Sequence, residues 1–151
     1  MSTAPLSALS SAQAGTLRAF AGPMIPASAA HRVPGADDDL IFADMTRDLG
    51  RDHADVVAAL ARLDMLAGGA FADLPADRRL AVANQWRSEG GPAFQSLTRV
   101  VLLAYYRDDR VMRSLGQEPR PPFPKGHVVE QGDWSLLDPV KKRPPLWRKV
   151  V

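Results

Sequence analysis

Residues 90–109 read GGPAFQSLTRVVLLAYYRDD and hold the most apolar run of the chain. The opening Gly90-Gly91-Pro92 is a strong break, because paired glycines end one helix and a proline suits the first turn of the next. Phe94 and Leu97 precede the apolar run at helical spacing. Valine and tyrosine also favour strands, so residues 100–106 alone are compatible with a β-strand. The continuous spacing favours a helix, and apolar residues on all its sides predict a central helix surrounded by neighbours.

Three helices are predicted before this central one in the first half of the chain. Ser10 and Gln13 form a capping-box pattern ahead of a helix that ends between Pro23 and Pro26. Residues 37–39 are three aspartates, which suit the positive end of a second helix that we expect to stop at Gly50. A third helix is expected to begin after Asp52, with Val56, Leu60 and Leu63 on one buried stripe, and to end at Gly68-Gly69.

The remaining helices lie on either side of the central one. Pro75 is expected to start a fourth helix. Its inward positions are predicted to be Leu80, Ala83 and either Trp86 or Arg87. A short sixth helix is predicted over residues 109–115, capped by Asp108. The pattern therefore predicts an all-α fold, a small bundle of five to six helices over residues 10–116, after a flexible N-terminus of residues 1–9.

Residues 117–151 differ in composition and hold seven of the thirteen prolines. We expect this tail to be extended, with residues 118–124 largely polyproline II and residues 141–147 extended for the same reason. Large apolar side chains are spaced along it, and they favour burial against a surface of this chain or of another one. The tail is therefore predicted to dock on a partner. The predicted partner-binding residues are Phe123, Trp134, Leu137, Leu146 and Trp147 in the tail, with Tyr105 and Tyr106 at the end of the central helix.

Length and composition exclude several classes of protein. A chain of 151 residues suits one domain, and a net charge of +2 is too small to indicate nucleic-acid binding. The absence of cysteine excludes disulfides, thiolate metal sites and cysteine nucleophiles. No apolar stretch approaches the length of a membrane span, and no Sec signal is visible. We expect a cytoplasmic protein as sequenced, or a periplasmic one if it is exported with a partner or has lost a signal.

No motif indicates catalysis or cofactor binding by this chain. The glycines form neither a dinucleotide-binding fingerprint nor a P-loop. His31, His53 and His127 lack the spacing of a metal site, and the aspartates at 37–39 lack that of a calcium loop. The basic residues 141–143 are expected to form a solvated rim around apolar anchors, since a nucleic-acid site needs a larger basic surface. We predict no catalytic, cofactor-binding or metal residue.

Four stretches, taken in order, give the chain a family resemblance across roughly residues 10–116. They are Thr16-Leu17-Arg18-Ala19-Phe20 leading to Ile25-Pro26-Ala27, then Pro34-Gly35-Ala36-Asp37, then Phe71-Ala72-Asp73-Leu74-Pro75 before Arg78-Arg79, and finally Leu97-Thr98 through Tyr105-Tyr106-Arg107-Asp108-Asp109-Arg110-Val111 to Leu115-Gly116. This order resembles the gluconate 2-dehydrogenase subunit 3 family, the small subunits of flavin-dependent dehydrogenases of the glucose–methanol–choline type.

The resemblance implies a non-catalytic accessory subunit. In that family the large subunit holds FAD and the catalytic histidine and oxidises an alcohol or sugar, and a cytochrome or other acceptor takes the electrons. The small subunit supports folding, stability and often export of its partner. This chain departs from the family in lacking a twin-arginine signal and in carrying the long proline-rich tail. The residues alone also leave open a stand-alone helical module that binds protein or nucleic acid, and an enzyme without a recognisable motif.

Overall fold

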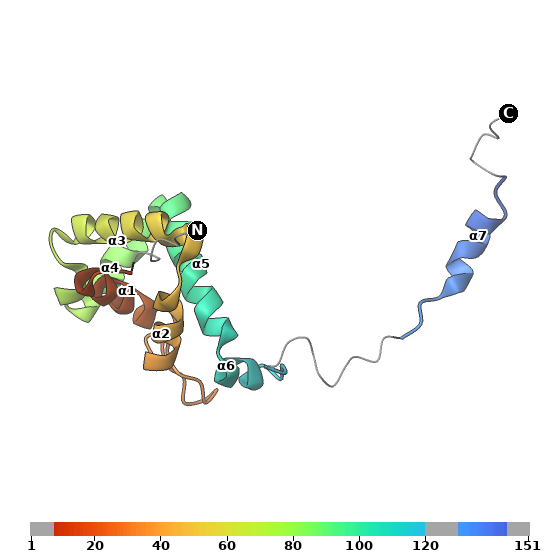
Figure 1. Cartoon of the computed structure of the whole chain (residues 1–151), viewed down its shortest axis with the longest axis horizontal. Coiled ribbons are helices and arrows are strands. Elements are labelled where there is room, and N and C mark those ends of the chain that lie inside the picture. The colour runs from red at the N-terminus through yellow and green to blue at the C-terminus, as the bar shows by residue number, and fades with distance from the viewer. Residues whose placement is uncertain (1–7, 120–129, 145–151) are drawn as a thin grey trace, which may run out of the picture. The chain divides into compact units, whose positions relative to one another are not determined.

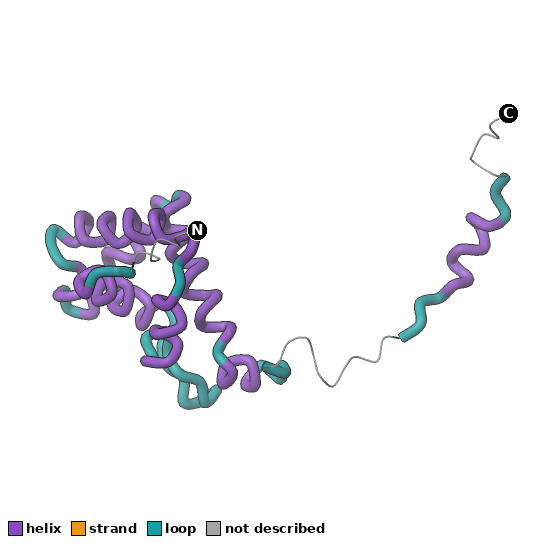
Figure 2. Tube along the Cα trace, in the orientation of Figure 1, coloured by secondary structure: helices purple, strands orange, loops and turns teal. Residues whose placement is uncertain are grey.

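The computed structural model describes residues 8–119 and 130–144 of the chain, which separates into two compact units at residues 1–119 and 120–151. We call residues 8–119 the helical body and residues 130–144 the C-terminal segment, and describe each by itself. The ordered elements of both are helical (Figure 1). Figure 2 contains no strand in the described ranges, where the only β-type pairing is an isolated antiparallel bridge between Ser28 and Val33. The predicted all-α bundle is confirmed for the body.

The first two helices begin where their capping residues predict. Helix α1 spans Ser11–Met24, and Ser10 and Gln13 form both hydrogen bonds of the capping box. Helix α2 spans Asp39–Arg47, and the Asp38 side chain accepts a hydrogen bond from the Leu40 backbone N–H. Helix α2 ends at Arg47, three residues before the stop predicted at Gly50. Gly50 itself begins a short 3₁₀ helix, η1, at Gly50–Asp52.

Helices α3 and α4 follow one another along the chain, contact each other and are joined through a second 3₁₀ helix. Helix α3 spans His53–Ala67 and ends at Gly68, whose φ of 71° is a left-handed conformation that suits glycine. The connection contains η2 at Phe71–Asp73, and α4 spans Ala76–Glu89 after Pro75. The Asp64 carboxylate of α3 fixes the connection, because it accepts hydrogen bonds from the Phe71 backbone N–H at 2.9 Å and the Thr16 hydroxyl at 3.2 Å.

Helix α5, at Pro92–Arg107, is the longest of the body and packs against α2 and α3, with the short α6 at Asp109–Ser114 following it. The predicted helical conformation of residues 100–106 is confirmed. Asp108 caps α6 as predicted, by accepting a hydrogen bond from the Arg110 backbone N–H. The core is a single cluster contributed by every helix of the body from α1 to α6. Its largest fully buried side chains are Phe71, Leu17, Ile41, Leu60, Leu63, Leu97, Val56, Val101 and Val111.

Two expectations about helix faces are wrong. Leu80 on α4 was expected to face inward, but it is half exposed, and Val82 and Trp86 carry the contact of α4 with the core. Trp86 packs edge-on against Phe20 of α1 and Phe94 of α5, which sets the rotation of α4 about its axis. Helix α5 was expected to be surrounded on all sides, but its Leu103 and Tyr106 are more than half exposed.

Residues 134–141 of the C-terminal segment are helical and not extended as predicted, whereas residues 120–129 and 145–151 of the tail lie outside the described residues. Residues Trp134–Leu137 form a 3₁₀ helix, η3, which continues into a short helix, α7, at Asp138–Lys141. Asp133 initiates this turn, since its carboxylate accepts hydrogen bonds from the backbone N–H and hydroxyl of Ser135. Pro139 lies in the first turn of α7, where a proline lacks no needed hydrogen bond. Local capping therefore overrides the extended conformation expected from composition.

Candidate functional site

Helix α5 has one face in the core and one face open. The buried side holds Leu97, Val100, Val101, Ala104 and Tyr105. The opposite side carries further large apolar residues, of which Leu103 and Tyr106 are more than half exposed. An amphipathic helix normally presents polar residues outward, so an exposed apolar face marks a surface for recognition.

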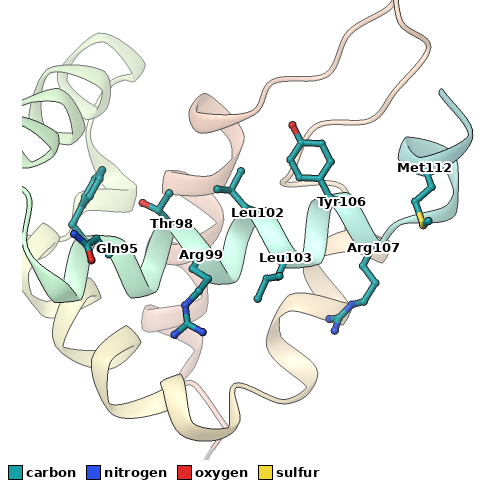
Figure 3. A pocket seen from close by; sticks show the side chains of 9 residues that line it. Gln95, Thr98, Arg99, Leu102, Leu103, Tyr106, Arg107 and Met112 are labelled. Atoms are coloured by element: carbon teal, nitrogen blue, oxygen red, sulfur yellow. The ribbon is translucent and has the colours of Figure 1, made fainter. Parts of the chain in front are cut away.

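The open face of α5 forms a groove of about 760 Å³. Its apolar lining comes mainly from α5, and Met112 of α6 contributes one more side chain (Figure 3). Leu103 and Tyr106 are 55% and 53% exposed, which is high for side chains of this size in a folded body. The apolar lining residues are Phe94, Leu102, Leu103, Tyr106 and Met112.

The labelled side chains of α5 fall into two rows in Figure 3. Thr98, Leu102 and Tyr106 project to one side of the helix axis, and Arg99, Leu103 and Arg107 project to the other. Each row follows the spacing i, i+4, i+8, the natural ridge of an α-helix. The groove thus has one apolar edge and one edge with an arginine on each side of a leucine.

Both arginines of the second row are anchored by carboxylates outside the groove lining. Arg99 pairs with Asp52 of η1, and Arg107 donates from Nε to Asp44 of α2 at 2.9 Å. Helix α3 begins after Asp52, as predicted. The Asp52 side chain makes no capping hydrogen bond to α3, however, and binds Arg99 instead. In both pairs the arginine is more exposed than the aspartate, at 41% against 15% and 65% against 25%. The edge therefore presents cationic groups to a ligand.

Arg110 of α6 joins two carboxylates at the starts of α2 and α6. Arg110 donates to Asp38 Oδ1 at 2.7 Å and to Asp108 Oδ1 at 3.0 Å, and these two carboxylates also cap α2 and α6. The hydrogen bonds from the Arg110 side chain hold the pKa of both carboxyls below its usual range. Bonding to Asp108 and Asp38 raises the pKa of Arg110 in turn. One side chain thus ties two helix starts together.

The two tyrosines predicted to bind a partner have different environments. Tyr106 lines the groove and is accessible. Tyr105 is only 5% exposed and belongs to the core, so its assignment as a partner-binding residue is corrected. Burial raises the pKa of the Tyr105 hydroxyl, as expected for a phenol removed from water. Adjacent residues on a helix point about 100° apart, so Tyr105 can face the core while Tyr106 faces the groove.

The candidate residues of the tail are described only in part. Trp134 and Leu137 lie in the C-terminal segment, which by itself buries neither side chain. The Trp134 indole donates to the Gln131 side chain at 3.2 Å. Phe123, Leu146 and Trp147 lie outside the described residues.

Within 8–119 and 130–144, no cluster of three or more histidine or acidic side chains is placed to bind a metal ion. None of the helices found in these ranges combines the length and apolarity that crossing a bilayer requires.

Sequence reasoning missed most of the groove. Tyr106 was among the predicted partner-binding residues, but Phe94, Leu102, Leu103 and Met112 were not. The signal was present in the sequence, because Leu103 and Tyr106 fall on the opposite side of a helical wheel from Leu97, Val101 and Ala104. A helix that is apolar on all sides is normally predicted to be buried, however, because the sequence does not show how many other helices pack around it.

No family model, no curated protein and no solved structure shows significant similarity to this chain.

Proposed function

We propose that this chain is a non-catalytic accessory subunit that assembles with a flavin-dependent dehydrogenase of the glucose–methanol–choline type. The open apolar groove on α5 carries the proposal, because a folded body that leaves such a face uncovered gains stability by docking to a partner. The ordered resemblance of residues 10–116 to the gluconate 2-dehydrogenase subunit 3 family supplies the class of partner.

The C-terminal segment offers a second apolar surface for the same role. Trp134, Leu137 and Val140 recur at spacings of three residues along η3 and α7, and each is at least 43% exposed. Tryptophan is the residue most enriched at binding hot spots, since a buried indole excludes water over a large area. In this proposal FAD and the catalytic groups belong to the partner, which oxidises an alcohol or sugar and passes electrons to a cytochrome or another acceptor.

The test is co-expression of a tagged chain with the flavin-binding oxidoreductase whose gene lies nearest to it. We expect a stable complex that carries the yellow flavin absorbance through affinity and size-exclusion chromatography. Trp134→Ala is expected to weaken assembly by about 2–4 kcal/mol, as loss of a buried hot spot does. The control is Met65→Ala, because Met65 is an exposed residue of α3 outside both surfaces.

Two results would count against the role. A free, monodisperse chain that elutes without the flavoprotein would overturn it. Equal complex yield for Trp134→Ala, Met65→Ala and the parent chain would remove the C-terminal segment from the interface.

A further inference from the structure

We infer that the α5 groove binds an amphipathic helix of a partner protein, with carboxylates along one flank of its apolar stripe. The identity of that partner rests on the proposed function. The preference for an acidic amphipathic helix does not rest on the proposed function, because it follows from the shape and charge of the groove in the helical body.

The shape of the groove favours a helix over a small molecule. The face from Phe94 to Arg107 is about 20 Å long at 1.5 Å per residue, and it is open along its length. A small ligand is normally buried on most of its surface, which an open face cannot achieve. A helix lying along α5 would set its own i, i+3, i+4, i+7 side chains against the two rows of this face.

The charge of the groove selects the flanking residues of that helix. The nine residues of the lining include two arginines and no acidic residue. Asp44 is shared by Arg107 and Arg47, and Asp52 pairs with Arg99, so these three arginines and two aspartates together keep one net positive charge. Arg99 and Arg107 are eight residues apart on one edge, about 12 Å along the axis. Glutamates two turns apart on one flank of a docked helix match that separation.

The same two arginines argue against a second copy of this chain as the occupant. If two α5 helices paired antiparallel around Leu103, Arg99 of each copy would face Arg107 of the other. Like charges brought together at an interface weaken binding and disfavour that partner.

The test uses two fluorescein-labelled helical peptides of about 18 residues, a length that supports helix formation. Both carry leucines at i, i+3, i+4 and i+7, and they differ only in one flank, which holds either glutamates or lysines two turns apart. Fluorescence anisotropy with the full chain is expected to give about tenfold tighter binding of the glutamate peptide, because two charge contacts change from repulsive to attractive.

Variants separate the groove from the rest of the surface. Leu103→Glu is expected to remove binding of the glutamate peptide, since it places a carboxylate in the apolar centre of the groove. Arg107→Glu is expected to reduce or invert the preference between peptides. Arg78→Glu on α4 makes the same change in net charge away from the groove and should leave the preference intact. Circular dichroism confirms that each variant is folded.

Four results would overturn the inference. They are equal binding of both peptides, binding of neither, an Arg78→Glu effect as large as that of Arg107→Glu, and a dimer of the chain that Leu103→Glu dissociates. The experiment needs no flavoprotein, so its outcome is independent of the co-expression test. Acid-selective binding without a flavoprotein complex would leave the inference standing and the proposed function refuted.

Discussion

Arg110 illustrates how a single side chain can couple two helix starts. Its guanidinium bonds two aspartates that already accept backbone hydrogen bonds at the first turns of α2 and α6. Each carboxylate is thus held by a helix terminus and by a cation, both of which favour its charged form. The sequence indicated both aspartates as caps, because capping depends on neighbours in the chain. It gave no sign of Arg110 as their common partner, since Asp38 and Arg110 are brought together only by tertiary packing.

The first prediction concerns the pH dependence of this cluster. Because the folded-state pKa of Asp38 and Asp108 is depressed, their contribution to stability is complete above the ordinary value of 3.8 and is lost as the pH falls through the lower folded-state values. Arg110→Gln is expected to reduce the free energy of unfolding by about 1 kcal/mol at pH 7, a modest value because solvent screens these partly exposed groups. Urea unfolding should show the difference shrinking below pH 3.8.

The matched control for this prediction is Arg113→Gln. Arg113 pairs with Asp109 on the surface of α6, and both side chains are well exposed. Its loss should change stability by less than about 0.5 kcal/mol. A difference between Arg110→Gln and the parent that stays constant with pH would contradict the role assigned to the two carboxylates.

At the scale of the helices, the sequence predicted where helices begin and end more accurately than which of their faces are buried. The ends marked by Ser10, Asp38, Gly68 and Asp108 match the sequence because caps and left-handed glycines act within a few residues. Which face of a helix is buried depends on where its neighbours lie. On α4 the buried position is Val82 and not the predicted Leu80. On α5 the face with Leu103 and Tyr106 is exposed, although its apolar composition predicted that it would be buried.

Helix α5 therefore has two faces that respond differently to truncation, which is the second prediction. Leu97→Ala should lower the free energy of unfolding by about 2–5 kcal/mol, because it leaves a cavity beneath a fully buried side chain. Leu103→Ala, six residues further along the helix, should change it by less than about 0.5 kcal/mol. Chemical denaturation followed by circular dichroism measures both. Equal losses would mean that the groove face is covered in solution.

At the scale of the molecule, the chain consists of a body with its own core and a separate second unit. Within residues 8–119 and 130–144, the buried core side chains all lie between Leu17 and Val111. The division was expected from composition, since helical periodicity stops where the prolines begin. The short helical turn at residues 134–141 was not expected, because a few local hydrogen bonds from Asp133 decide it.

The third prediction is that deleting residues 120–151 leaves the fold of the body intact. The core side chains found in the described residues all lie outside this segment, so the stability of the body should change by less than about 0.5 kcal/mol. Assembly with the flavoprotein should weaken, since the segment with Trp134 is lost. Thermal unfolding by circular dichroism and co-purification separate the two effects. A truncated chain that fails to fold would show that the two units are not independent.

The position of Trp86 has a practical consequence for such experiments. It is the only indole within residues 8–119, and it lies where α1, α4 and α5 meet, against Phe20 and Phe94. Emission from the truncated chain would therefore come from a single chromophore at the junction of three helices. Its wavelength would report whether that junction is dry, and a red shift would record the entry of water before the helices themselves unwind.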